Sequence, residues 1–199
     1  MKRVAAFSAV LAALTVAGCG SDTTTNASDR STTDTPSRAA SDARSCVTTA
    51  ETVLRGTLHG AVRGTIAADA GTTECRGMPR PREQGLRLQF RTAGVSRMNL
   101  PPLVLILGID TLGRGDTGSA LRTTVTLIDE DQERFFSTGE QQSCFSDVLK
   151  HRALEQDAQS VITGTLWCTA AIPQVNGQRS VRISELDFEG VVSWPEPTP

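Results

Sequence analysis

Apolar and polar side chains alternate with a period of two along much of the chain from residue 46 onward. In the segment 86–91, for example, Leu86, Leu88 and Phe90 alternate with arginine and glutamine. Such alternation is typical of a strand that buries one face, because successive side chains point to opposite sides of a sheet. Patterns of this kind predict about seven strands, at 57–66, 86–91, 103–109, 121–127, 134–137, 162–168 and 181–194.

Short strands separated by Gly, Pro and Asp turns predict an all-β fold, either a β-sandwich or a small closed barrel. The run 103–109 is continuously apolar and follows two prolines, so we expect a central strand that is covered on both faces. The phase of the alternation changes near Ser184 and Glu185, which predicts a β-bulge. The acidic turn 129–131 is expected to lead a hairpin into 134–137.

One segment admits two interpretations. A short helix over 147–158 would have Ser146 as its N-cap, and Leu149 and Ala153 would share one helical face. The region between the cysteines at 144 and 168 could equally hold two strands. The fold class is therefore all-β with at most one short helix.

The first eighteen residues have the layout of a secretory signal peptide. Two basic residues precede an uncharged, mostly apolar stretch that is too short to span a bilayer. The string Val16-Ala17-Gly18-Cys19 resembles the lipobox of bacterial lipoproteins. This resemblance implies cleavage before Cys19, lipidation of its thiol and a lipid-anchored place in the cell envelope. Gly20, rather than Asp, follows Cys19, which resembles cargo sorted to the outer membrane in a bacterium that has one.

Residues 19–45 are expected to form a tether. After Cys19 this segment is rich in Ser, Thr, Asp and Ala and contains no large aliphatic or aromatic residue. Such a segment buries too little apolar surface to offset its ordering entropy, so we expect it to be disordered. The chain is thus interpreted as a signal peptide at 1–18, a lipidated tether at 19–45 and a single β-rich domain at 46–199.

Four cysteines remain in the domain, and export would place them in an oxidising compartment. An even number predicts two disulfides, and three pairings are possible. We favour Cys46–Cys75 and Cys144–Cys168, because nearest-neighbour closure suits adjacent strands. No Cys-x-x-Cys pair exists, and neither histidine has useful ligand spacing, so no metal site or cofactor is predicted.

The string Asp116-Thr117-Gly118-Ser119 resembles the loop that carries the catalytic Asp of pepsin-like and retroviral-type aspartic proteases. This resemblance implies that Asp116 would share a proton and a water with a second Asp, which one copy per chain supplies only in a homodimer. The apolar-apolar-Gly element of that family is matched by Ile106-Leu107-Gly108. It precedes Asp116 here, whereas in the family it follows. A turn rich in Gly, Asp and Thr is the simpler interpretation.

A cluster of arginines forms the second candidate site, a possible patch for an anionic ligand such as a glycan or a lipid headgroup. If 86–91 is a strand, its two arginines point to the outer face, where charges are usually solvated. The acidic segment 129–157 could pair with this patch, in this chain or another. The patch consists of Arg76, Arg80, Arg82, Arg87 and Arg91.

Three further features receive structural interpretations. The turn Asp129-x-Asp131-x-Glu133 resembles alternate calcium ligands but has Arg134 where an EF-hand loop has glycine.

His59 is expected on the outer face of a strand and His151 on a helix surface or a loop. Trp167 and Trp194 are expected to pack against the core. No G-x-S-x-G nucleophile motif is present.

The formal net charge of −2 argues against nucleic acid as a partner, because phosphate binding requires a basic face. The sequence therefore favours an envelope lipoprotein with a non-catalytic β domain that binds a protein or an anionic glycan. The alternatives are a hydrolase acting through Asp116 and a small inhibitor or assembly factor. The latter would be similar in plan to periplasmic lysozyme-inhibitor lipoproteins.

Overall fold

The structure, a computed structural model, describes residues 46, 48, 50–80, 85–94, 100–154 and 158–195. The expected signal peptide, Cys19, the tether and Arg82 lie outside these described residues. Within the described ranges there is no helix with the length and apolar character needed to cross a membrane.

Every regular element in the described residues is a β-strand, and the strands form one continuous sheet. In chain order they are β1 (Thr52–Gly60), β2 (Gly64–Asp69), β3 (Thr73–Pro79), β4 (Gly85–Thr92), β5 (Leu103–Asp110), β6 (Gly118–Asp129), β7 (Arg134–Ser137), β8 (Cys144–Ala153), β9 (Gln159–Cys168), β10 (Ile172–Pro173) and β11 (Ser180–Ser193).

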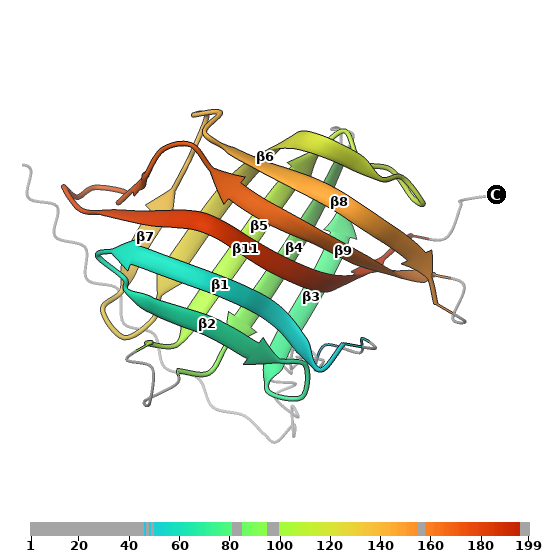
Figure 1. Ribbon diagram of the computed structural model, residues 1–199, viewed down its shortest axis with the longest axis horizontal. Coiled ribbons are helices and arrows are strands. Elements are labelled where there is room, and N and C mark those ends of the chain that lie inside the picture. The colour runs from blue at the N-terminus through green and yellow to red at the C-terminus, as the bar shows by residue number, and fades with distance from the viewer. Residues whose placement is uncertain are drawn as a thin grey trace, which may run out of the picture. The chain divides into compact units, whose positions relative to one another are not determined.

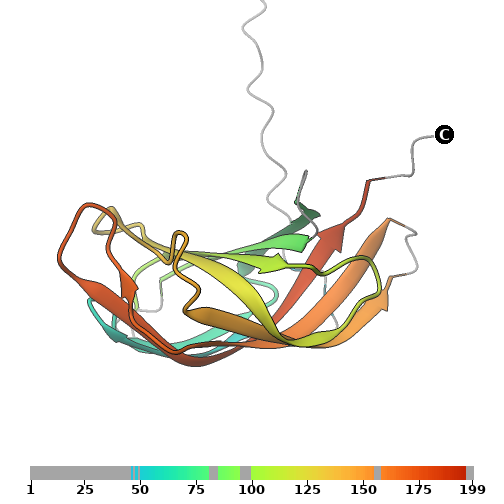
Figure 2. The same cartoon turned by 90° about the horizontal axis from the view of Figure 1, so that it is seen from above.

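The sheet folds over into two layers, with strand order β2-β1-β11-β9-β8-β6-β5-β4-β3 (Figures 1 and 2). We call β2, β1, β11, β9 and β8 the front layer; β5, β4 and β3 cross behind them in Figure 1 and, with β6, form the back layer. The first part of β6 pairs with β8, and the rest pairs with β5 and β7. Because β6 continues from one layer to the other, the sheet becomes a nearly closed, barrel-like sandwich. The all-β fold expected from the sequence is confirmed.

The core lies between the two layers and is filled by the alternating apolar residues of both. Its largest fully buried side chains include Phe90 of β4, Phe136 of β7 and Phe188 of β11. In β5, residues 103–105 and 107–109 are all buried, as expected for a central strand. Small residues let the layers approach closely, because a Cβ at Gly77 of β3 would collide with the backbone of β11.

The prediction of a single strand over 57–66 is wrong. The alternation continues through a turn there, so that β1 ends at Gly60 and β2 begins at Gly64. Both glycines have positive φ, at 102° and 152°, in a region that favours glycine. This hairpin, together with β3, β8 and β10, raises the number of strands in the described residues from the expected seven to eleven.

The helical interpretation of 147–158 is also wrong, and the two-strand alternative is confirmed by β8 and β9. Buried side chains recur at every second position from Cys144 to Val148, which is the period of a strand. A register shift between Val148 and Lys150 leaves the side chain of Leu149 64% exposed. The bulge therefore explains why an apolar residue broke the expected alternation.

The bulge predicted in the last strand is confirmed. In the pairing of β1 with β11, Gly56 lies opposite Leu186 but Leu58 lies opposite Ile183, so β11 holds one extra residue at 184–185. The hairpin predicted after the acidic turn is confirmed by the pairing of β6 with β7.

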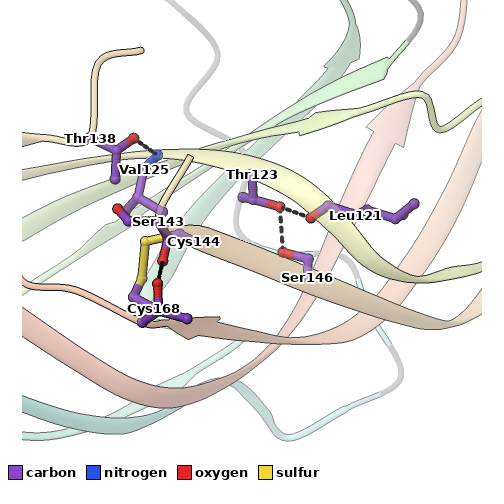
Figure 3. The surroundings of a disulfide bond; sticks show 9 residues. Leu121, Thr123, Val125, Thr138, Ser143, Cys144, Ser146 and Cys168 are labelled. Atoms are coloured by element: carbon purple, nitrogen blue, oxygen red, sulfur yellow. Dashed lines mark hydrogen bonds between the residues drawn. A yellow bond between two sulfur atoms is a disulfide. The ribbon is translucent and has the colours of Figure 1, made fainter. Parts of the chain in front are cut away.

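Both predicted disulfides, Cys46–Cys75 and Cys144–Cys168, are present. Cys144 and Cys168 are register partners on β8 and β9. Figure 3 shows this bond beside β6, where the backbone N–H of Val125 donates to the Thr138 hydroxyl at 3.0 Å. The N–H of Cys46 donates to the carbonyl of Thr73 at 3.1 Å, so the start of the domain lies against β3.

Candidate functional site

The outward face of the back layer carries the basic patch that the sequence suggested. Leu86, Leu88 and Phe90 of β4 are buried in the core, so Arg87 and Arg91 point away from it, as predicted. In β3, Arg76 is the register partner of Gln89 and therefore shares this outward face. We call this surface the arginine face and define it by Arg76, Arg80, Arg87, Arg91 and Arg122. Arg82 lies outside the described residues.

Acidic residues neutralise the two ends of the arginine face. At one end, Arg80 Nη1 lies 2.6 Å from Asp110 Oδ1, and Arg122 Nε lies 3.8 Å from Asp110 Oδ2. At the other end, Arg91 contacts Glu130 at 3.0 Å. The hydrogen bond to Glu130 raises the pKa of Arg91 above its ordinary value, and the negative charges of Glu130 and Glu74 act in the same direction. The Arg91–Glu130 pair is thus one contact between the basic patch and the acidic segment 129–157.

Arg87 lies between these two ends. Its side chain is exposed, and it forms no ion pair or side-chain hydrogen bond with any residue that the structure describes. An exposed guanidinium without a carboxylate partner is available to an anion from outside.

A polar cleft of about 540 Å³ opens at the Asp110 end of the arginine face. Arg80, Asp110 and Arg122 line one part of it, and the loop after β7 supplies amide side chains. Gln141 and Gln142 are the amides of that loop, and both are exposed. The cleft therefore combines two guanidinium groups and two primary amides with the carboxylates of Asp110 and Glu140, so its formal charges balance and it is polar without being basic.

Asp116 occupies an exposed turn between β5 and β6. Its Oδ2 accepts a hydrogen bond from the backbone N–H of Gly113 at 2.8 Å, within its own loop. The Gly-Asp-Thr turn interpretation thus describes its local structure. Ile106 and Gly108, from the element compared with the protease family, lie within β5.

His151 is not on a helix surface or a loop, contrary to expectation. It lies on β8, partly buried, with Nε2 2.8 Å from Ser160 Oγ and Nδ1 3.0 Å from the carbonyl oxygen of Asp116. Its ring stacks on Trp194, and the indole N–H of Trp194 donates to Ser160 Oγ at 2.7 Å. Ser160 is only 2% exposed, so this cluster fastens the Asp116 turn to β8 and β9. His59 is exposed on β1, as expected.

The acidic turn after β6 is organised by an ion pair. Asp129 is fully buried and accepts hydrogen bonds from Arg134 Nη2 at 2.5 Å and Arg134 Nε at 3.1 Å. Asp131 and Glu133 are exposed. Among the described residues, no three His, Cys, Asp or Glu side chains gather closely enough to hold a metal ion.

Comparison with protein-family models, curated proteins and solved structures finds no match to this chain. Sequence reasoning found four of the arginines of the arginine face and the acidic segment that contains Glu130, but it missed Arg122 and Asp110. Their participation depends on the pairing of β4 with β5 and of β5 with β6, which no local pattern reports.

Proposed function

We propose that this chain is a membrane-anchored envelope lipoprotein whose β domain is non-catalytic and binds an anionic partner through the arginine face. The proposed anchor is Cys19, on the strength of the lipobox resemblance. Acyl chains on Cys19 would hold the protein at a membrane, because each buried CH₂ contributes about 0.8 kcal/mol.

The observation that carries the binding proposal is the position of Arg87. It stands exposed at the middle of the arginine face without a carboxylate partner among the described residues, while the arginines at both ends contact acids of this chain. A binding face needs cations that the protein itself has not neutralised. The flanking apolar side chains of Met78 and Phe135, each 48% exposed, suit a contact surface as well.

Anchoring is tested by fractionating cells that express the full-length chain. We expect the unsubstituted protein in the membrane fraction and the Cys19→Ser variant in the soluble fraction. Retention of Cys19→Ser in the membrane fraction would contradict lipidation at that residue.

The binding face is tested with the secreted Cys19→Ser chain and isolated envelopes of the bacterium that makes it. Adding Arg87→Glu should reduce retention on the envelopes about tenfold, because a charge reversal replaces attraction by repulsion. Arg182→Glu, a charge reversal at another exposed arginine on β11, is the matched control and should leave retention unchanged. Equal loss in both variants would show that general charge, and not the arginine face, governs retention.

A further inference from the structure

The arginines of the arginine face lie in successive rows of the back layer. Backbone register defines four rows of outward residues across β3, β4 and β5. The backbone N–H of Arg80 donates to Gly85, the partner of Asp110, so Arg80 belongs to the first row. The rows are Arg80–Gly85–Asp110, Met78–Arg87–Gly108, Arg76–Gln89–Ile106 and Glu74–Arg91–Val104.

Each row contains one arginine, which belongs to β4, to β3 or, in the case of Arg80, to the residue directly after β3. Neighbouring rows are two residues apart along a strand, which corresponds to about 6.6–6.8 Å. Three steps separate the first row from the fourth, so the four arginines extend over about 20 Å along the strand direction. The backbone register therefore places one arginine in each row, at a nearly constant interval along the strands.

The two central rows differ from the end rows in charge. Asp110 lies in the first row, and Glu74 lies in the fourth, where Glu130 also reaches Arg91. The central rows contain Arg87 and Arg76 but no acidic residue. Continued onto β6, these rows add the hydroxyl side chains of Thr124 and Thr126. The centre of the face therefore places the exposed Arg87 guanidinium beside neutral hydrogen-bonding groups.

We propose that the arginine face binds a linear polyanion that lies along the strands, with anionic groups repeating at about the spacing of the rows, roughly 7 Å. This inference rests on the proposed function and names its ligand class. A regular interval of arginines matches a polymer with a repeated anionic group, either a phosphodiester or a carboxylate on a glycan or polyol chain.

The experiment measures binding of the full-length chain, held in mild detergent, to defined probes at several salt concentrations. Poly(glycerol phosphate) and polygalacturonate represent the phosphodiester and carboxylate sources, and each is compared with its monomer. Neutral dextran is the uncharged control, and phosphatidylglycerol vesicles test a lipid surface. We expect at least one polyanion to bind about tenfold or more tightly than its monomer, with affinity that falls as salt rises. The polymer that binds identifies the source of the anion.

Two variants locate the binding surface. Arg87→Gln should weaken polymer binding by about threefold to tenfold and reduce the slope of log affinity against log salt by about 0.7, as expected when one cation is removed from contact with a single-stranded polyanion. Arg182→Gln removes the same charge from β11 and should change neither quantity. Both side chains are exposed, and thermal denaturation of each variant should match the parent protein.

Several results would overturn the inference. These are binding to the vesicles but to neither polymer, equal binding of polymer and monomer, or equal losses in Arg87→Gln and Arg182→Gln. If retention on envelopes depends on Arg87 while neither polymer binds, the linear-polyanion inference fails and the proposed binding face stands. If envelope retention is also insensitive to Arg87, both fail.

Discussion

The buried ion pair after β6 offers a quantitative test of how the hairpin is held. Asp129 is 0% exposed, and the side chain of Arg134 is 16% exposed. Asp129 accepts two hydrogen bonds from the Arg134 guanidinium and one from the backbone N–H of Gln132 at 3.2 Å. Replacing Asp129 with alanine removes all three acceptor interactions and leaves the Arg134 charge largely buried without its partner.

Breaking a buried ion pair by removal of one partner costs about 3–5 kcal/mol. The free energy of unfolding should fall by that amount in Asp129→Ala. For a domain of this size each kcal/mol corresponds to a melting-temperature change of about 2–4 °C, so we expect a decrease of about 6–20 °C. Replacing both partners, with Asp129→Leu and Arg134→Met, should cost less than Asp129→Ala alone, because no charge is then left unpaired.

The assay is urea denaturation of the oxidised protein, followed by tryptophan fluorescence, with thermal melting as a second measurement. Asp131→Ala is the matched control, since Asp131 belongs to the same turn but is exposed. We expect the control to change stability by less than about 0.5 kcal/mol. If Asp129→Ala were as mild as Asp131→Ala, the argument that the hairpin depends on this ion pair would be refuted.

Two other predictions concern stability. Replacing both Cys144 and Cys168 by alanine should lower the free energy of unfolding by about 3.5 kcal/mol, because the bond closes a loop with a sequence separation of 24, and urea denaturation measures the loss. Ser160→Ala should lower it by about 1–3 kcal/mol, since Trp194 and His151 lose a buried partner. It should also change Trp194 fluorescence, whereas Ser193→Ala, at an exposed position of β11, should change stability by less than about 0.5 kcal/mol.

Some parts of the fold could be predicted because a pattern within a few neighbouring residues indicates them. The alternation of 86–91 and the phase change at 184–185 survive in the structure as β4 and the bulge of β11. β3 was missed because its buried positions include Thr73 and Gly77, which are too small or too polar to mark an apolar face. The turn between Gly60 and Gly64 was missed because the alternation happens to keep its phase across it.

The candidate site also has features that a local sequence pattern predicts and features that it does not. The outward direction of Arg87 and Arg91 follows from the burial of their neighbours on one strand, so it could be predicted locally. The meeting of Arg80 with Asp110 joins groups 30 residues apart and depends on how β4 pairs with β5. Register of this kind is set by packing across the whole sheet, and it also determines which arginines are neutralised.

The first disulfide connects the proposed anchor to the proposed binding face. Cys46 is bonded to Cys75 in β3, and its backbone lies against Thr73 of the same strand. Arg76, which stands in a central row of the arginine face, is the residue after Cys75. In an anchored protein, tension on the tether would therefore pass through a covalent bond into β3 before it reached β1. Because β3 lies against β11 and pairs with β4, such tension would be shared with strands of both layers.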